Sequence, residues 1–357
     1  MKFELNTMLL QAVLNKSVKA VSTKDLMPSL KNFVIKASTV TKCVTIIAGD
    51  GATYMIKDIP CNDIESSGDV CVDARSLTKY INKITEDSVV FETKDTDLLV
   101  KFGKKGKAKL KTIAVEDYIM PEELKFDVEN KPVDLAKLKQ ALKLCAITVS
   151  NNATEVYYTG YKVGEKVVST NRNNLTCVDV NVADVDMLLT RDFVALLYEL
   201  DGDALISYSE GFIKCVAENT TIIGNLLTGL EQFPPNELLD SLEFASSLTI
   251  NKKDLIPVLD RVLIFVESLG AVEFEFKNGV MTVKLVANQD ADTYEEISYV
   301  GDCKLTEPVR VNAGMLNSVL SAIEEESFVL KLGETAEDPI LVHSGTYKAL
   351  MATMNVD

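Results

Sequence analysis

The chain has 357 residues and is acidic, with a formal net charge of −16 and a single histidine. This charge argues against a protein that binds nucleic acid over its whole surface, and one histidine excludes a histidine-rich metal site. With 47% hydrophobic and 25% charged residues, the composition is typical of a soluble globular protein of two or three domains. No apolar run is long enough to span a bilayer and "MKFELNTMLL" lacks signal-peptide features, so we expect a cytoplasmic protein without membrane contact.

The predicted elements, taken in chain order, repeat three times. Helices begin after the N-cap residues Asn6, Asp134 and Asn251, and each helix places apolar residues four, seven and eight positions after its cap. These apolar residues are Leu10, Val13, Leu14, Leu138, Ala141, Leu142, Leu255, Val258 and Leu259. The caps are 128 and 117 residues apart, and this spacing indicates an internal repeat.

A second helix repeats in each third of the chain, after the caps Asp73, Thr190 and Asn312. Between the helices the pattern changes to the alternation of strands, as in "KCVTIIAGD", "EKVVSTN" and "MTVKLVANQ". Asn-Gly marks a hairpin turn in "VEFEFKNGVMTVKLV". We therefore predict an α+β protein of three tandem domains, residues 1–126, 127–243 and 244–357, each with two helices and mainly antiparallel sheets.

The most basic stretch is "KFGKKGKAKLK", residues 101–111. Lys107, Lys109 and Lys111 alternate with Ala108, Leu110 and Thr112, which predicts a strand with two different faces after a glycine-containing turn. Such lysines either blunt a free sheet edge or guide pairing with another chain.

Other basic residues are expected on the helices and in the segments that follow them, away from the apolar faces. They are Lys16, Lys19, Lys24, Arg75, Lys79, Lys83, Lys137, Lys139, Lys143, Lys252 and Lys253. A basic helical surface of this kind attracts polyanions, but lysine is also common on any solvated helix face, and charge alone does not separate the two.

Catalytic and metal-binding motifs are weak. "GKKGK" lacks the glycine spacing and the following serine or threonine of a phosphate-binding loop, and no cofactor is expected. The seven scattered cysteines form no Cys-x-x-Cys pair, which favours buried, reduced thiols. His343 in "ILVHSGTY" is expected in a strand with a structural or surface role. The acidic clusters "DTYEE" and "EEE" show no metal-ligand spacing, but the sequence leaves open an acidic α+β enzyme with an unidentified carboxylate site.

With the repeat and the basic helices in view, the chain resembles the bacterial replicative DNA sliding clamp, the β subunit of DNA polymerase III, over nearly its whole length. The segments that carry the resemblance are "MKFELNTMLLQAV", "AVSTKDLMPSL", "GDVCVDARSL", "VYYTG", "VKLVANQDADTYEEI" and "YKALMATM". The resemblance implies the DNA-clamp fold and a head-to-tail homodimeric ring. It also implies a non-enzymatic processivity factor that encircles double-stranded DNA without reading its sequence.

The resemblance also implies roles for individual residues. Lys24 matches a DNA-contacting loop of the family, and the other basic helix residues named above would line the hole. Asn151, Asn152 and Tyr157 fall in a second DNA-facing loop.

A hydrophobic cleft that binds peptide motifs of the polymerase and the clamp loader is implied as well. The family's Ala-Thr-Asp-Gly-His-Arg-Leu-Ala is replaced here by the sequence from Ser169 to Thr176, "STNRNNLT", and its Met-Pro-Met-Arg by "MATM" from Met351 to Met354. The cleft residues carried over by position are Tyr158, Thr170, Arg172, Leu175, Pro234, Leu239, Leu269, Leu350, Met351 and Met354.

The resembled fold gives the lysine-rich strand a place at the dimer interface, opposite an acidic edge of the third domain of the other protomer. The interface residues implied are Tyr80, Ile84, Lys105, Lys107, Lys109, Leu110, Asp290, Asp292, Glu295 and Glu296. We predict that Lys105, Lys107 and Lys109 guide dimer pairing rather than grip DNA, while Leu110 adds apolar contact.

Overall fold

The computed structural model describes residues 1–23, 27–152, 154–265, 270–286 and 292–354. It divides into two compact units, each described here by itself. Unit 1 consists of residues 1–135 and 190–226, and unit 2 of residues 136–189 and 227–357. Among the residues described, no helix has the length and apolar character needed to cross a membrane.

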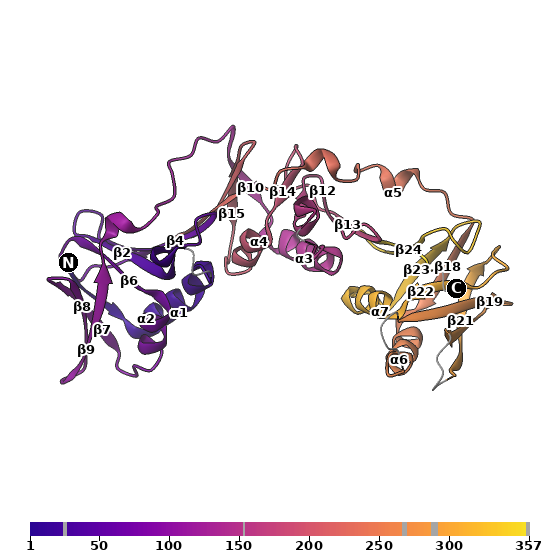
Figure 1. The fold of residues 1–357 in the computed structure, drawn as a ribbon, viewed down its shortest axis with the longest axis horizontal. Helices are drawn as coiled ribbons and strands as arrows, with labels where there is room; N and C mark the ends of the chain where they lie inside the picture. The colour runs from indigo at the N-terminus through magenta and orange to yellow at the C-terminus, as the bar shows by residue number, and fades with distance from the viewer. Residues whose placement is uncertain (24–26, 153, 266–269, 287–291, 355–357) are drawn as a thin grey trace. The chain divides into compact units, whose positions relative to one another are not determined.

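Unit 1 is built on one antiparallel sheet (Figure 1). In the described residues its strands follow the order β10-β15-β16-β17-β4-β3-β2-β6-β9-β8-β7-β1-β5. Their bounds are β1 (Lys2–Asn6), β2 (Asn32–Ser38), β3 (Cys43–Gly49), β4 (Thr53–Pro60), β5 (Ile64–Ser66), β6 (Gly68–Asp73), β7 (Ser88–Lys94), β8 (Asp97–Phe102), β9 (Gly106–Ile113), β10 (Val128–Val133), β15 (Ala204–Tyr208), β16 (Phe212–Ala217) and β17 (Thr220–Asn225). Its helices are α1 (Thr7–Ser17), α2 (Ala74–Ile81) and α4 (Arg191–Leu197), with the 3-10 turns η1 (Val18–Ala20), η2 (Pro28–Lys31) and η3 (Val115–Asp117).

Unit 2 has a second antiparallel sheet, ordered β14-β11-β12-β13-β25-β24-β23-β18-β21-β20-β19-β22 in the described residues. The strands are β11 (Tyr161–Val163), β12 (Lys166–Thr170), β13 (Asn174–Asp179), β14 (Met187–Leu189), β18 (Ser246–Asn251), β19 (Ala271–Lys277), β20 (Val280–Leu285), β21 (Tyr294–Asp302), β22 (Val309–Asn312), β23 (Ser327–Leu332), β24 (Ile340–Ser344) and β25 (Tyr347–Met351). The helices are α3 (Leu135–Cys145), α5 (Leu238–Ser241), α6 (Lys252–Leu263) and α7 (Ala313–Ala322), with η4 (Ala146–Thr148), η5 (Val156–Thr159) and η6 (Leu230–Gln232).

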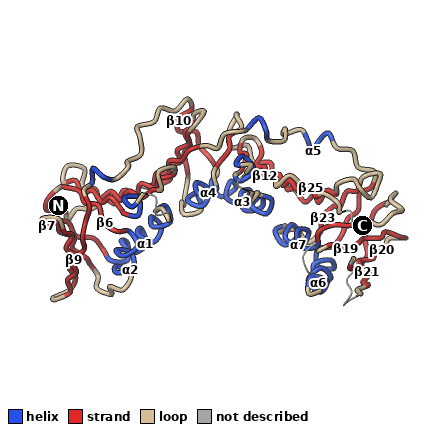
Figure 2. The backbone as a smooth tube through the Cα atoms, viewed as in Figure 1, coloured by secondary structure: helices blue, strands red, loops and turns tan. Residues whose placement is uncertain are grey.

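The element order confirms the threefold repeat. Each third of the chain runs strand, helix, four strands, helix and three strands; among the described residues the first third adds the short strand β5 and the second the short helix α5. In unit 1, α1, α2 and α4 lie on one side of the sheet, and in unit 2, α3, α6 and α7 do the same (Figure 2).

The helix starts follow from capping. The side chains of Asn6, Asp73, Thr190, Asn251 and Asn312 each accept a hydrogen bond from a backbone N–H in the first turn, at 2.7–3.0 Å. Such a cap stabilises a helix by about 1 kcal/mol. Five predicted caps are therefore confirmed, and α3 begins directly after the sixth, Asp134.

The predicted apolar helix faces form the core. The nine residues predicted from the caps of α1, α3 and α6 are all at least 96% buried. Burial of side chains of this kind contributes roughly 1.5–3 kcal/mol each, so these faces fix the helices on the sheets.

Several local predictions are confirmed. Asn278 and Gly279 both have positive φ, as a two-residue hairpin loop requires, between β19 and β20. His343 lies in β24, and its Nε2 is 3.1 Å from the carbonyl oxygen of Gly345. All seven cysteines lie in the described residues and none forms a disulfide; Cys43 and Cys303 are half-buried and the other five are buried.

Sheet pairing crosses both predicted domain boundaries. In unit 1, β4 of the first third pairs with β17 of the second, and in unit 2, β13 of the second third pairs with β25 of the last. The middle third is therefore shared between the two compact units. The partition into residues 1–126, 127–243 and 244–357 stays a prediction based on the repeat.

Candidate functional site

An apolar cluster in unit 2 brings together several of the predicted cleft residues. Leu175 and Leu239 belong to its buried part, and Tyr158 and Leu350 pack against it. Tyr158 stacks edge-on against Tyr157 and Phe233, with ring centroids 4.5 and 5.7 Å apart. We call these residues, with Val168, Cys177, Leu188, Leu227, Leu230, Leu238, Leu242, Phe244 and Leu341, the cleft cluster.

Lysines hold the segment that contains η6 and α5 over this cluster. Lys162, which is 3% exposed, donates to the carbonyl oxygen of Pro234 at 2.7 Å and lies 5.6 Å from the ring centroid of Phe233. Burial lowers the pKa of its ammonium group, and Asp186 at 3.6 Å opposes that shift. Asp240 accepts hydrogen bonds from two further lysines.

Those two lysines lie on different strands. Lys348 on β25 and Lys166 on β12 donate to Asp240 at 2.8 and 3.2 Å, and in that order they lower the pKa of its carboxyl group. The segment is therefore tied to both strands beneath it, which gives the cluster a fixed lid on one side.

A network of hydroxyl groups supports the cleft cluster from the core. Thr148 Oγ1 lies 2.6 Å from both Ser169 Oγ and Thr176 Oγ1, and Thr176 donates to the carbonyl oxygen of Cys145 at 3.3 Å. All of these residues are buried. The network links the end of α3 to β12 and β13, and satisfied buried networks of this kind fix side-chain geometry.

A cavity of about 560 Å³ lies beside the turn between β12 and β13. Met354, one of the predicted cleft residues, lines it together with Asn173, Asn174, Met315 and Ala352. The backbone N–H of Ala352 donates to the carbonyl oxygen of Asn173 at 2.9 Å, so the C-terminal segment is held against the turn.

The remaining predicted cleft residues are distributed as follows. Thr170 and Met351 are 3% and 1% exposed and belong to the floor rather than to an open surface. Pro234 is half-buried in the lysine-held segment. Arg172 lies at the rim, with its Nη2 3.3 Å from Glu155 Oε1. Leu269 lies outside the described residues.

In unit 1, two of the predicted DNA-facing lysines form ion pairs with the loop after α4. Lys16 Nζ lies 2.7 Å from Asp201 Oδ2 and also donates to the carbonyl oxygen of Glu199 at 2.9 Å. Lys19 Nζ lies 2.6 Å from Glu199 Oε1. These contacts offset much of the positive charge of Lys16 and Lys19.

Arg75, Lys79 and Lys83, at and after α2, have exposed side chains. Lys24 lies outside the described residues. The exposed basic charge predicted for unit 1 therefore lies mainly on α2 and in the residues directly after it.

In unit 2, Lys137 and Lys143 on α3 are exposed and Lys139 is half-buried. Lys252 donates to the carbonyl oxygen of Ile323, and Lys253 pairs with Glu326. Lys253 lowers the pKa of that carboxyl group.

Asn151 and Asn152 are exposed, whereas Tyr157 packs on the cleft cluster. Tyr157 thus contributes to the cluster rather than to a free loop.

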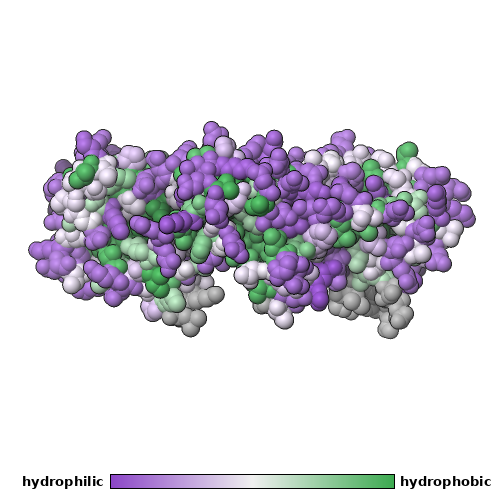
Figure 3. Space-filling view, turned by 90° about the horizontal axis from the view of Figure 1, so that it is seen from above, coloured by the Kyte–Doolittle hydropathy of each residue, from purple (hydrophilic) through white to green (hydrophobic). Residues whose placement is uncertain are grey.

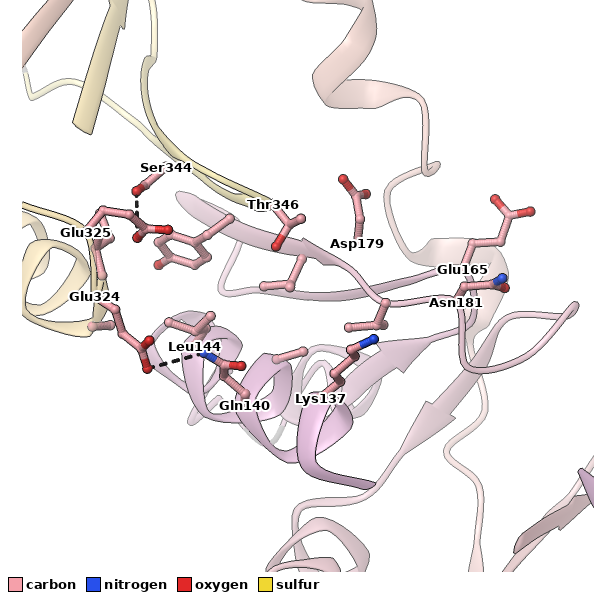
Figure 4. Close-up of a pocket in the computed structure, with 16 residues that line it drawn as sticks. Lys137, Gln140, Leu144, Glu165, Asp179, Asn181, Glu324, Glu325, Ser344 and Thr346 are labelled. Atoms are coloured by element: carbon pink, nitrogen blue, oxygen red, sulfur yellow. Dashed lines mark hydrogen bonds between the residues drawn. The ribbon is translucent and has the colours of Figure 1, made fainter. Parts of the chain in front are cut away.

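Acidic side chains line a cavity of about 550 Å³ beside α3 (Figure 4). Gln140 donates to Glu324 at 3.3 Å, and Ser344 donates to Glu325 at 2.9 Å. Glu165 and Asp179 also line this cavity. Their negative charge weakens the positive potential of α3 on this flank.

This cavity is also the place to seek a carboxylate enzyme site. The pKa of the Glu325 carboxyl group is lowered, first by its own backbone N–H and then by Ser344. A catalytic general acid needs the opposite shift, so Glu325 acts as a hydrogen-bond acceptor that fixes the turn. At Glu325, therefore, the geometry does not support the enzyme hypothesis.

The lysine-rich strand β9 is an edge over most of its length, as predicted. It pairs with β8 from Gly106 to Lys111, and with β6 only at Thr112 and Ile113. Lys107, Lys109 and Lys111 are exposed, and Ala108 and Leu110 are half-buried. Among the described residues, the outer edge of 106–111 therefore has no strand partner.

Two of the strand's lysines form ion pairs within their own domain, which the sequence did not indicate. Lys109 and Lys111 lie 2.7 and 3.0 Å from the carboxylate of Asp97 on β8, and in that order they lower its pKa. One carboxylate faces two lysines, so Asp97 offsets only part of their positive charge, and the role of Lys109 in guiding a partner stays a prediction. Lys105 and Lys107, the other two lysines predicted to guide pairing, are also exposed, as is Lys104.

A second edge segment lies in unit 2. Residues 294–298 of β21 pair with β20, whereas residues 299–302 pair with β18. The outer edge of 294–298 thus lacks a strand partner in the described part of the chain. Glu295 is bound by Arg261 of α6, Glu296 and Asp292 are exposed, and Asp290 lies outside the described residues.

Exposed apolar residues occur on this second edge and directly after α6, whose Arg261 binds Glu295 on β21, and sequence reasoning missed them. Ile264 and Phe265, directly after α6, are 75% and 44% exposed, and Tyr294 on β21 is 62% exposed. In the sequence they merge with the apolar pattern of α6, so nothing marked them as solvent-facing. Figure 3 shows one face, on which hydrophilic side chains predominate and hydrophobic ones gather in separate patches.

The other predicted interface residues differ in exposure. Tyr80 is half-buried and packs edge-on against Phe102, with ring centroids 6.1 Å apart. Ile84 is 6% exposed, and its carbonyl oxygen accepts a hydrogen bond from Gln11. Ile84 is thus part of the core of unit 1, which leaves little of its side chain for a second chain to contact.

Comparison with known proteins identifies relatives of the chain. Residues 1–121 match the sequence model of the family described as DNA polymerase III beta subunit, N-terminal domain. The beta sliding clamp of Mycoplasma capricolum is 20% identical, with 96% of each chain covered.

Solved structures share the fold over 100% of both chains. They include the DNA polymerase III subunit beta of Pseudomonas aeruginosa and the beta subunit of Streptococcus pyogenes, both with a TM-score of 0.91 and 18% identity. A sliding clamp from Bartonella birtlesii bound to griselimycin has a TM-score of 0.89 and 20% identity.

Proposed function

We propose that the chain is a divergent member of the bacterial DNA sliding-clamp family and acts as a DNA polymerase processivity factor. Two copies would close head to tail into a ring around double-stranded DNA. The observation that carries the proposal is the whole-length match of the fold, with the family's sequence pattern in the first 121 residues.

A ring holds DNA by enclosure, so it needs little affinity for the phosphates. Weak, sequence-independent attraction from helix lysines keeps the ring mobile, because tight contacts would stop it from sliding. The exposed basic residues of α2 suit this task, and the ion-paired Lys16 and Lys19 suit it less. Lys137 and Lys143 are exposed on α3 and are proposed to take part as well. The net charge of −16 keeps the rest of the surface unattractive to DNA.

Dimer closure is proposed to pair the two edge segments, β9 of one protomer with β21 of the other. Strand addition at such edges forms main-chain hydrogen bonds that are missing in one protomer. Leu110 on β9, with Tyr294 on β21 and with Ile264 and Phe265 directly after α6, would supply apolar contact.

Charge favours the same arrangement. Residues 1–126 carry 19 basic and 17 acidic side chains, whereas residues 244–357 carry 9 basic and 18 acidic ones. Head-to-tail pairing therefore brings a weakly positive region against a strongly negative one, which speeds association and disfavours head-to-head pairing.

The cleft cluster and the adjoining cavity of about 560 Å³ are proposed as the site for peptide motifs of a polymerase and a clamp loader. An apolar surface with a few polar groups at its rim is the usual form of a peptide-binding groove. The protein itself is proposed to have no catalytic role, to need no cofactor and to act in the cytoplasm without membrane contact.

The test is retention on DNA of two topologies. The labelled protein is loaded onto a nicked circular plasmid, with a clamp loader if needed, and isolated by gel filtration. We expect a dimer that stays on the circle and is lost when a restriction enzyme linearises the plasmid. A monomer, or equal loss from both forms, would contradict the proposal.

A further inference from the structure

The turn between β12 and β13 holds an arginine in a backbone conformation that favours glycine. Arg172 has a φ of 78°, in the left-handed region, at the first of the two central positions between Asn171 and Asn174. A side chain at such a position costs free energy that glycine avoids. The backbone N–H of Asn171 donates to the carbonyl oxygen of Asn174 at 3.1 Å, so the tight turn imposes this conformation.

Turn geometry does not account for the choice of arginine. The neighbouring residues in the turn, Asn171, Asn173 and Asn174, are of the type that tolerates the left-handed region best after glycine. A long basic side chain at Arg172 gains nothing from the turn. Backbone strain of this kind is typical of functional positions, where the side chain has a task outside the turn.

The side chain of Arg172 faces a carboxylate at the rim of the cleft cluster. Its Nη2 lies 3.3 Å from Oε1 of Glu155, the residue before η5. Tyr157, which packs on the cleft cluster, donates to the same oxygen at 3.4 Å. The ion pair therefore joins the turn to the segment that carries the cluster's aromatic rings.

This ion pair is loose. The Nη2–Oε1 distance is longer than the roughly 2.8 Å of a tight charge-assisted hydrogen bond. The side chain of Arg172 is 66% exposed, so water screens the pair. An incoming carboxylate can therefore replace Glu155 at small cost.

The same turn borders both parts of the proposed peptide site. Asn173 and Asn174 line the cavity that contains Met354, and Leu175 belongs to the cleft cluster. A peptide that fills the cluster and the cavity must pass close to Arg172.

We propose that Arg172 is a specificity residue of the cleft that binds a carboxylate of the partner peptide, and that Glu155 occupies this place in the free protein. The guanidinium group offers paired N–H donors that match a carboxylate. This inference rests on the proposed peptide cleft and adds the chemistry of the partner, an apolar motif with an acidic residue beside it.

The experiment uses fluorescent nonapeptides with a Leu-Phe pair for the apolar surfaces. A single glutamate is moved through the other positions, and each peptide is compared with its glutamine twin by fluorescence anisotropy on the full-length protein. At one position we expect the glutamate peptide to bind about three- to fivefold more tightly, the range of an exposed ion pair. With Arg172→Gly, the glutamate and glutamine peptides should bind equally well. Glu155→Gln should raise the affinity for the glutamate peptide.

Arg172→Gly also serves as its own folding control, because glycine relieves the positive φ and the thermal midpoint should not fall. If the wild type binds every glutamate peptide and its glutamine counterpart equally well, the inference is wrong, whereas the proposal of a peptide-binding cleft stands. If Arg172→Gly weakens retention on DNA and leaves the preference for the glutamate peptide unchanged, the arginine contacts DNA rather than the peptide and the inference is wrong. If no peptide binds although the plasmid assay succeeds, the proposed cleft fails and the inference fails with it, whereas the ring stands.

Discussion

The lysines of β9 and those of α3 carry the same charge but lie in different surroundings. Lysines on β9 alternate along a sheet edge that lacks a partner in the described protomer, and two of them pair with Asp97. Lys137 and Lys143 are exposed on a helix whose opposite face is buried in the core. A strand edge can recruit another strand, whereas a helix face offers only side chains, so a basic stretch must be interpreted with its secondary structure.

The largest expected effect lies on the surface that would receive β9. Replacing Ile264 and Phe265 together by glutamate places two charges in the proposed apolar contact. The dimer dissociation constant should rise at least about 100-fold, as for loss of central apolar contacts. Sedimentation equilibrium measures it, and Val40→Glu, at a site 90% exposed on unit 1, is the matched control that should leave the dimer unchanged.

Charge reversal on α3 should affect DNA and spare the dimer. Lys137, Lys139 and Lys143 replaced by glutamate should weaken DNA binding about 10- to 100-fold. The slope of log affinity against log salt should become smaller by about one for each lost phosphate contact. A fluorescence titration at several salt concentrations gives both values. A changed dimer constant with unchanged DNA affinity would reverse the assignment.

Charge reversal on the β9 edge should weaken the dimer and spare DNA binding. Glutamate at Lys105 and Lys107 should raise the dimer dissociation constant about three- to tenfold, mainly through slower association, as rim charges do. Stopped-flow mixing of labelled protomers measures this rate. If dimerisation is unchanged and DNA binding is weaker, these lysines contact DNA and the assignment to the dimer interface is wrong.

Lys16 and Lys19 test whether an ion pair within the protein lowers the contribution of a lysine to DNA binding. Because Asp201 and Glu199 already offset their charge, Lys16→Gln with Lys19→Gln should weaken DNA binding less than about twofold. A loss as large as that of the α3 variant would mean that the two pairs open when DNA is present.

The smallest effect concerns pH. The pKa of Asp97 is lowered first by Lys109 and then by Lys111, so its ionised form is favoured in the folded protein. Its contribution is present above the ordinary carboxyl pKa and is lost as the pH falls through the lowered folded value. With Asp97→Asn, the free energy of unfolding in urea should therefore differ less between neutral and acidic solution than it does for the wild type. An unchanged pH profile would show that the pair contributes nothing.

Much of the fold was predictable because its signals are local. The caps Asn6, Asp73, Thr190, Asn251 and Asn312 form contacts two or three residues away, and the apolar spacing that follows is a property of one helix. Turn geometry at Asn278 and Gly279 is equally local. The repeat then followed from comparing these local patterns.

The site was less predictable because its contacts join distant segments. Lys19 meets Glu199, which lies 180 positions further along the chain, and the lysines that bind Asp240 come from two different strands. The exposure of Ile264 and Phe265 depends on where α6 ends and on what covers its last turn. The strain at Arg172 appears only once the turn is built.

Closure of the ring through β9 and β21 can be tested most directly by cross-linking. In a background with the two half-buried cysteines removed (Cys43→Ser and Cys303→Ser), Lys107→Cys and Glu296→Cys are joined by a short bismaleimide after loading on a nicked circle. We expect a covalent dimer that stays on the circle in about 1 M salt, where charge attraction is screened, and slides off once the circle is cut. Failure to cross-link while both single-cysteine variants react, or equal loss of the covalent dimer from circular and linear DNA, would contradict the account.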